Sequence, residues 1–221
     1  AMAVALPYMS IALYGFFTQA GAELLLLLVA IVLFERADEE NFLNWTIPLC
    51  LLNIAMGNVW WVITVPLFFV TAIAVFLAEV PALNKAKALL LKLGILGVSG
   101  LLTLIPAFAM LFLSDYSIKS QTLLNGPYEP ISFKRVFVVY LVGAILLLML
   151  IRKKYDSSNT IFWNIKSALK SWLVFPITIN AFVILYVLYQ LYELHLVNYY
   201  GNKLMWTSLT LTTMAMTFCV G

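Results

Sequence analysis

The residue of this sequence that is best placed to do chemistry is Glu23, a single acid inside a long apolar run. From Ser10 to Phe34 no other side chain is charged, and Gln19 precedes Glu23 by one helical turn on the same face. A carboxylate at the centre of a bilayer costs at least about 2.5 kcal/mol on insertion scales, so such groups are usually protonated, paired or in contact with water. Two interpretations stay open: Glu23 handles protons or cations, or it donates one interhelical hydrogen bond as a neutral acid.

A second polar group lies near the end of the apolar run Leu173–Leu194. Gln190 and Glu193 are three residues apart, and His195, the one histidine of the chain, follows. An imidazole titrates near neutral pH and a carboxylate can orient it, so this group is a candidate for proton handling. The spacing of Glu193 and His195 places them on different faces of a helix, which argues against a direct pair. The other interpretation is an interfacial belt, because several tyrosines flank these residues.

Four threonines, Thr207, Thr210, Thr213 and Thr217, recur three or four residues apart in the last apolar run. This spacing places them on one face of a helix. Their hydroxyls are candidates for lining a hydrated path. In the alternative they bond to carbonyls of the preceding turn or to a neighbouring helix, at about 0.6 to 2 kcal/mol each, and serve helix packing.

Other reactive side chains are few. The two cysteines, Cys50 and Cys219, lie far apart within apolar runs. A zinc site needs three or four N, S or O ligands and haem usually takes paired histidines, so we predict no metal and no cofactor. The run Gly97-Val98-Ser99-Gly100 resembles the rhomboid intramembrane serine proteases, but over four residues only. We assign no catalytic residue, and the sequence favours a protein that is not an enzyme.

The elements that must position these residues follow from composition. Apolar residues make up 64% of the 221 residues and charged residues only 10%. Soluble domains average about 45 to 50% apolar and about 25% charged, so this chain cannot cover itself with polar surface in water. Only helices and closed barrels satisfy backbone groups in lipid, and these apolar runs are too long for barrel strands. The sequence therefore predicts an all-α polytopic membrane protein with six to seven transmembrane helices.

The expected crossings come from dividing the apolar runs by the about 20 residues that a transmembrane helix needs. The run from Phe42 to Val80 would be about 58 Å long as one helix, so it must break, and Gly57-Asn58 is its best turn signal. Whether the short segment Phe42–Met56 spans the membrane stays open. The expected segments are 10–34, 42–56, 59–79, 93–113, 136–151, 173–194 and a last run after Lys203.

We expect residues 1–221 to form one transmembrane bundle without a soluble domain. Both ends lie next to apolar runs, which predicts a trimmed chain or a part of a longer one. Basic residues gather in two segments, Lys85 to Lys92 and Arg152 to Lys170, and the positive-inside rule places both in the cytoplasm.

Three functions are compatible with these features. The first is a transport or permease-type subunit, which the mid-membrane acid Glu23 favours. The second is a non-catalytic integral subunit of a larger membrane complex. The third, a membrane-embedded lipid-modifying enzyme, lacks a recognisable site. The partners we expect are the lipid bilayer and either other membrane subunits or further copies of the chain. The net charge of +3 does not indicate nucleic-acid binding, because basic residues in membrane proteins mark cytoplasmic loops.

Overall fold

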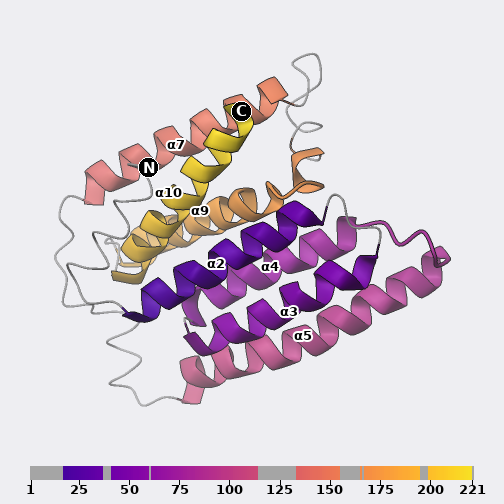
Figure 1. Cartoon of the computed structure of the whole chain (residues 1–221). Coiled ribbons are helices and arrows are strands. Elements are labelled where there is room, and N and C mark those ends of the chain that lie inside the picture. The colour runs from indigo at the N-terminus through magenta and orange to yellow at the C-terminus, as the bar shows by residue number, and fades with distance from the viewer. Residues whose placement is uncertain are drawn as a thin grey trace. The chain divides into compact units, whose positions relative to one another are not determined.

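The structure is a computed structural model that describes residues 17–36, 41–59, 61–113, 133–154, 165, 167–194 and 199–220. Within these residues every long regular element is an α-helix and no strand occurs, so the all-α prediction is confirmed for them (Figure 1). The helices are α2 (Phe17–Glu35), α3 (Phe42–Val59), α4 (Trp61–Leu77), α5 (Lys85–Leu113), α7 (Phe133–Lys154), α9 (Val174–Leu194) and α10 (Tyr199–Val220).

The described helices fall into two compact units. One contains α2 to α5 together with residues 168–175, and the other contains α7, α10 and α9 from Pro176 onward. We call them the α2–α5 unit and the α7–α10 unit. The single bundle expected from the sequence stays a prediction.

In the α2–α5 unit, the four helices run alongside one another, with α2 packed on α3 and α3 on α4. Each helix buries one apolar stripe because large side chains recur at helical spacing. The fully buried side chains include Leu33 of α2, Leu49 and Met56 of α3, and Ile63 and Leu67 of α4. This core holds the polar residues described below in fixed positions.

The expected break in the run from Phe42 to Val80 occurs, but about two residues later than Gly57-Asn58: α3 continues through both residues to Val59, and α4 begins at Trp61. Gly57 lies inside α3 and forms no turn. A Cβ atom there would lie 3.5 Å from the carbonyl oxygen of Thr103 and 3.7 Å from a methyl group of Thr64, which are ordinary contact distances. The packing would therefore also accept an alanine at this position.

Helix α5 begins earlier than expected and includes the basic segment that the sequence placed before the crossing. Asn84 caps it, since its side chain accepts a hydrogen bond of 2.9 Å from the backbone N–H of Lys87. Lys92 points to the end of α4, where its Nζ donates to the carbonyl oxygens of Phe76 (3.1 Å) and Ala78 (2.5 Å). These bonds satisfy carbonyls that the helix leaves without partners.

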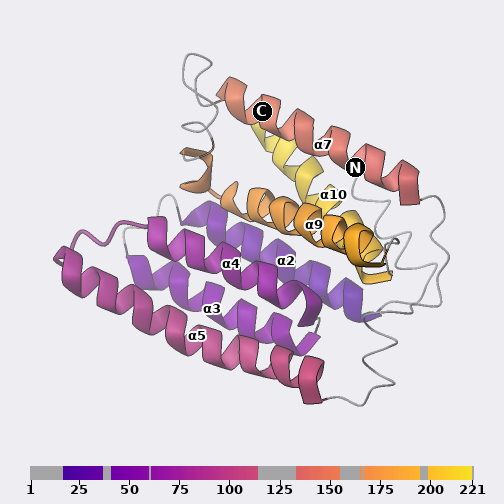
Figure 2. The same ribbon diagram turned by 180° about the vertical axis from the view of Figure 1, so that it is seen from behind.

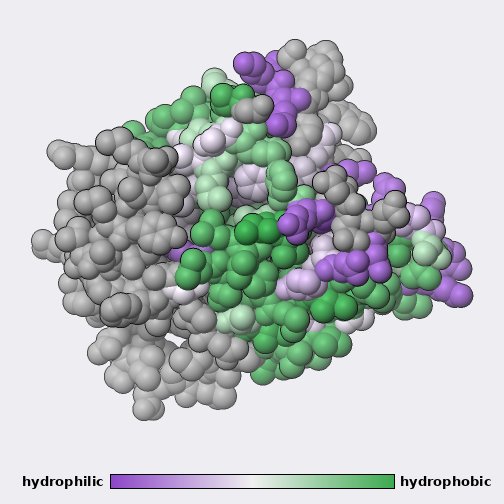
Figure 3. All heavy atoms as spheres, in the orientation of Figure 1, coloured by the Kyte–Doolittle hydropathy of each residue, from purple (hydrophilic) through white to green (hydrophobic). Residues whose placement is uncertain are grey.

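Among the described residues, two helices are long and apolar enough to cross a membrane, Lys85–Ile105 and Val174–Tyr192. Phe42–Gly57, Ile63–Leu77 and Leu204–Val220 are shorter apolar helices. These two spans weakly suggest a membrane protein. Much of the surface over α3 and α5 is hydrophobic, and hydrophilic residues gather at the end where α5 begins (Figure 3).

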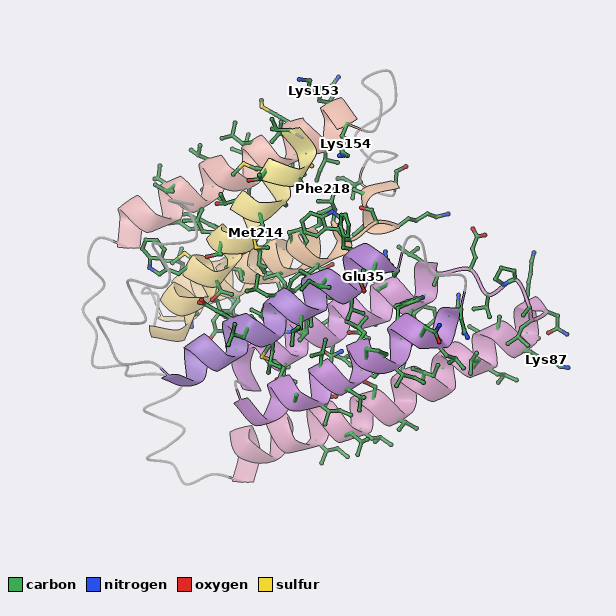
Figure 4. All side chains as sticks on the ribbon, viewed as in Figure 1. Glu35, Lys87, Lys153, Lys154, Met214 and Phe218 are labelled. Atoms are coloured by element: carbon green, nitrogen blue, oxygen red, sulfur yellow. The ribbon has the colours of Figure 1, made fainter. Side chains whose placement is uncertain are left out.

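In the α7–α10 unit, α7 packs against α10. A Cβ atom on Gly143 of α7 would meet side-chain carbons of Leu209 and Thr212 of α10 at 3.6 Å, an ordinary contact distance. At the end of α7, Lys154 lies over the ring of Phe218 at 4.1 Å and donates to the Phe218 carbonyl oxygen at 3.2 Å (Figure 4). The lysine therefore caps the end of α10.

Candidate functional site

Glu23 lies in α2 on the face that packs against the unit's core. Its side chain is 8% exposed, and it shares this face with the buried Leu26, Ala30 and Leu33. The opposite face of α2 is exposed and apolar. Glu23 takes part in an interaction within the structure, so the residue is not without a partner. Gln19 lies in the first turn of the same helix, and its side chain is outside the described residues.

Asn53 and Thr71 form a buried polar contact in the same unit. The amide nitrogen of Asn53 in α3 donates to the hydroxyl of Thr71 in α4, and that hydroxyl donates to the carbonyl oxygen of Leu67 at 3.1 Å. Both side chains are fully buried, and the Asn53 Oδ1 atom has no hydrogen-bond partner within the described part of the chain. A buried polar atom without a partner costs about 1 to 3 kcal/mol.

Glu23 and the Asn53–Thr71 contact lie at a similar level of the α2–α5 unit. Glu23 and Asn53 are each about three helical turns from the short connection between α2 and α3. Because α2 and α3 are packed neighbours joined by a short loop, residues equally far from that loop lie side by side along the helix axes. Glu23, Asn53 and Thr71 therefore occupy one layer of the unit, and we call it the α2–α4 polar layer.

In the α7–α10 unit, Asn180 joins all three helices. The hydroxyl of Tyr140 in α7 donates to the Asn180 carbonyl oxygen at 2.9 Å. The Asn180 amide nitrogen donates to the carbonyl oxygen of Pro176 (2.7 Å) and to the hydroxyl of Thr212 in α10 (2.8 Å). That hydroxyl in turn reaches the carbonyl oxygen of Ser208 at 2.8 Å. All these side chains are buried, which makes the network a strong constraint on helix register.

The four threonines proposed for a polar path do not share one environment. Thr207 is buried at 2% exposure, whereas Thr210 and Thr213 are half-buried and Thr217 is exposed. The hydroxyls of these last three donate to carbonyls four residues earlier in α10, at 3.2, 2.8 and 2.9 Å. The buried polar face of α10 consists instead of Thr207, Ser208 and Thr212.

The polar group at the end of α9 is described only in part. Gln190 is 2% exposed and has an interaction partner. Glu193 lies in the last turn of α9, but its side chain is outside the described residues, as is the whole of His195. The proposed relay between them therefore stays a prediction.

Arg36, at the end of α2, is a residue whose role the sequence did not indicate. Its Nη2 atom donates to the carbonyl oxygens of Leu169 (3.3 Å) and Ser171 (2.8 Å), and its guanidinium lies 5.6 Å from the ring centre of Trp45. Burial lowers the pKa of Arg36 to about 10. In the sequence Arg36 stands among the acids Glu35, Asp38, Glu39 and Glu40, which indicates only a charged helix end. The signal that was missed is the pair Trp45 and Trp172, since tryptophan faces accept cations and Trp172 lies beside the bound carbonyls.

Comparisons with known protein families, with curated proteins and with solved structures find no match for this chain. Among the described residues, no three His, Cys, Asp or Glu side chains lie together as metal ligands. Ser99 of the rhomboid-like run is buried in α5, where its side chain faces Cys50 of α3. The chemistry available in the described helices is therefore that of a buried acid at the level of a buried amide and a buried hydroxyl group.

Proposed function

We propose that this chain is a transport or permease-type membrane subunit in which Glu23 handles a proton or a cation. The observation that carries the proposal is the burial of Glu23 in the α2–α4 polar layer. Burying a carboxyl group among apolar helices costs free energy. An ionisable residue that is kept there despite this cost is therefore a candidate for a functional role. The free Oδ1 of Asn53 supplies a second oxygen at the same level, and oxygen atoms are the ligands that hard cations prefer.

The lengths of the helices support a six- to seven-crossing arrangement. The shortest of them, α4, has 17 residues and the next, α3, has 18, which correspond to about 26 and 27 Å. These lengths are close to the about 30 Å of a bilayer core. On this proposal the short helix α3 crosses the membrane, since it packs against both α2 and α4.

The positions of basic residues support a cytoplasmic location for one end of the α2–α5 unit. Lys170 lies 3.8 Å from Glu79 at the end of α4, and α5 begins with Lys85 and Lys87 just after that end. Both basic segments predicted to be cytoplasmic thus contribute lysines to the same end of this unit. The positive-inside rule then places this end in the cytoplasm.

The test is a proton-flux measurement in liposomes that carry a pH-sensitive dye inside. Glu23→Gln keeps the shape of the side chain and removes its charge, so we expect flux to fall to the level of empty liposomes. Glu35→Gln is the matched control, because it makes the same change at an exposed position of the same helix. Normal flux in Glu23→Gln, or equal loss in both variants, would contradict the proposal.

The second candidate function is a non-catalytic subunit of a membrane complex. It is favoured by α7, which exposes a row of large apolar side chains that includes Val138, Val142, Ile145 and Met149. Purification in a mild detergent distinguishes the two functions. A stable complex with another membrane protein would favour this candidate, and an active isolated chain would favour transport.

A further inference from the structure

We infer that the α2–α5 unit carries a binding site for one anionic phospholipid, with its acyl chain between α3 and α5 and its headgroup at the lysines that begin α5. The inference rests on the membrane location proposed above, but not on the role of Glu23. Three features of this unit point to such a site: an apolar groove, a hollow that continues it, and two exposed lysines at the end of both.

The groove lies between α3 and α5, which run side by side in both views (Figures 1 and 2). Its volume is about 600 Å³, and its lining is apolar apart from Cys50 and Ser99. From Leu90 to Leu102, its lining on α5 extends for about 18 Å, close to the about 15 Å depth of one bilayer leaflet. The groove therefore has the length and chemistry of a site for one acyl chain. Its lining residues are Ile47, Cys50, Leu51, Ile54, Leu90, Leu91, Gly94, Ile95, Val98, Ser99 and Leu102.

Gly94 is the reason that the groove is open. A Cβ atom on Gly94 would meet nothing within 4 Å, so the missing side chain leaves space rather than allowing close contact between helices. Gly97 is equally open but does not line the groove. The two glycines thus form a natural pair for testing whether the groove itself matters.

A second hollow, of about 800 Å³, adjoins the groove, and Leu91 lines both. It is bounded by the start of α3 and by the loop before α5, where Asn41 and the backbone of residues 80–83 lie. Two helices begin beside this hollow, and the backbone N–H groups at a helix start favour negative charge. The hollow therefore continues the apolar groove into a region suited to a headgroup.

Two exposed lysines supply the positive charge at this end. Lys85 and Lys87 are both exposed, and neither takes part in the ion pair found within the described ranges of the unit. Lys87 lies on the groove side of α5, since Leu91, Gly94 and Val98 follow it at helical spacing. Figure 4 shows Lys87 at the end of α5, beyond its apolar part. Juxtamembrane lysines attract anionic lipids.

The same charge argues against a second copy of this chain as the occupant. Two copies related by an axis along the membrane normal place identical residues at the same depth. Packing through this groove would then bring Lys85 and Lys87 of each copy near those of the other, and like charges repel. A phospholipid with a negative headgroup pairs with them instead.

The experiment is native mass spectrometry of the delipidated full chain in detergent, after exposure to equimolar phosphatidylglycerol and phosphatidylcholine. We expect the wild type to retain one phosphatidylglycerol preferentially. Each lysine contributes roughly fivefold to the preference, so K85Q/K87Q should lower it on the order of 20-fold. R152Q/K153Q removes two exposed charges from the end of α7 and should leave the preference unchanged.

The groove is tested by G94L, which should reduce retention of phosphatidylglycerol, while G97L should not. An unchanged preference in K85Q/K87Q, or equal retention in G94L and G97L, overturns the inference. A change of oligomeric state in G94L without loss of lipid overturns it in favour of a second copy. A chain that stays in solution without detergent refutes the membrane location as well, whereas equal binding of both lipids refutes this site alone.

Discussion

The buried network around Asn180 gives the sharpest prediction, because two neighbouring threonines of α10 have different roles in it. The hydroxyl of Thr212 accepts from the Asn180 amide of another helix, whereas that of Thr213 bonds only to the Leu209 carbonyl of its own helix. Replacing each threonine with valine removes the hydroxyl and keeps the shape of the side chain. The two variants therefore separate an interhelical hydrogen bond from a bond within one helix.

The expected magnitudes follow from the bonds that are lost. Interhelical hydrogen bonds in membranes contribute about 0.6 kcal/mol on average and about 1.7 kcal/mol at most. Thr212→Val should therefore lower the free energy of unfolding by about 1 to 2 kcal/mol, since it also leaves part of a buried amide unpaired. Thr213→Val should change it by less than about 0.5 kcal/mol. Asn180→Ala should cost about 2 kcal/mol or more, because it loses two hydrogen bonds and leaves a cavity.

The assay is reversible unfolding in mixed micelles with increasing denaturing detergent, followed by circular dichroism. A double-mutant cycle of Thr212→Val with Asn180→Ala isolates the pair, and we expect a coupling of about 0.6 to 1.7 kcal/mol. Zero coupling would refute the network as described. So would equal destabilisation by Thr212→Val and Thr213→Val.

Two further predictions concern the α2–α5 unit. Gly100→Ala should destabilise the protein, because its Cβ would lie 3.1 Å from the Phe68 ring. Gly94→Ala should stabilise it by about 0.5 to 1 kcal/mol, because alanine has the higher helix propensity and its Cβ meets nothing within 4 Å. Thermal unfolding that ranks the two variants in the opposite order would contradict this packing. Arg36→Gln should release residues 168–172 from the end of α2 and so increase the rate of tryptic cleavage after Lys170 severalfold. Arg152→Gln is the control, and equal cleavage rates in the two variants would show that Arg36 does not hold the segment.

The helical class and most helix positions follow from the sequence, because apolar runs bounded by charges leave few alternatives. The predicted 173–194 and the observed α9 differ by one residue at the start. The break in the long run from Phe42 was misplaced because glycine is ambiguous. It permits a turn, but it also occurs inside helices, and α3 runs through Gly57 and ends two residues later.

The polar contacts were harder to predict, because they depend on which helix faces share an interior. Periodicity placed four threonines of α10 on one face, but the face that is buried passes through Thr212, which was not on that list. Asn180 stands out in the sequence as a polar residue within an apolar run, but its partner Tyr140 lies 40 residues earlier in another helix. One sequence does not predict this pairing, because hydrophobic periodicity indicates which face of a helix is buried but not which helix packs against that face.

Lys92 has a consequence for how the turn between α4 and α5 tolerates change. Its amine donates hydrogen bonds to the last carbonyls of α4, so a side chain links α4 and α5 directly, in addition to the loop that connects them. We therefore expect substitutions that change the size or charge of the exposed loop residues to leave the packing of α4 against α5 unchanged. The surface around the phospholipid headgroup is thereby uncoupled from the scaffold, so its ligand preference is able to diverge while the helices keep their alignment.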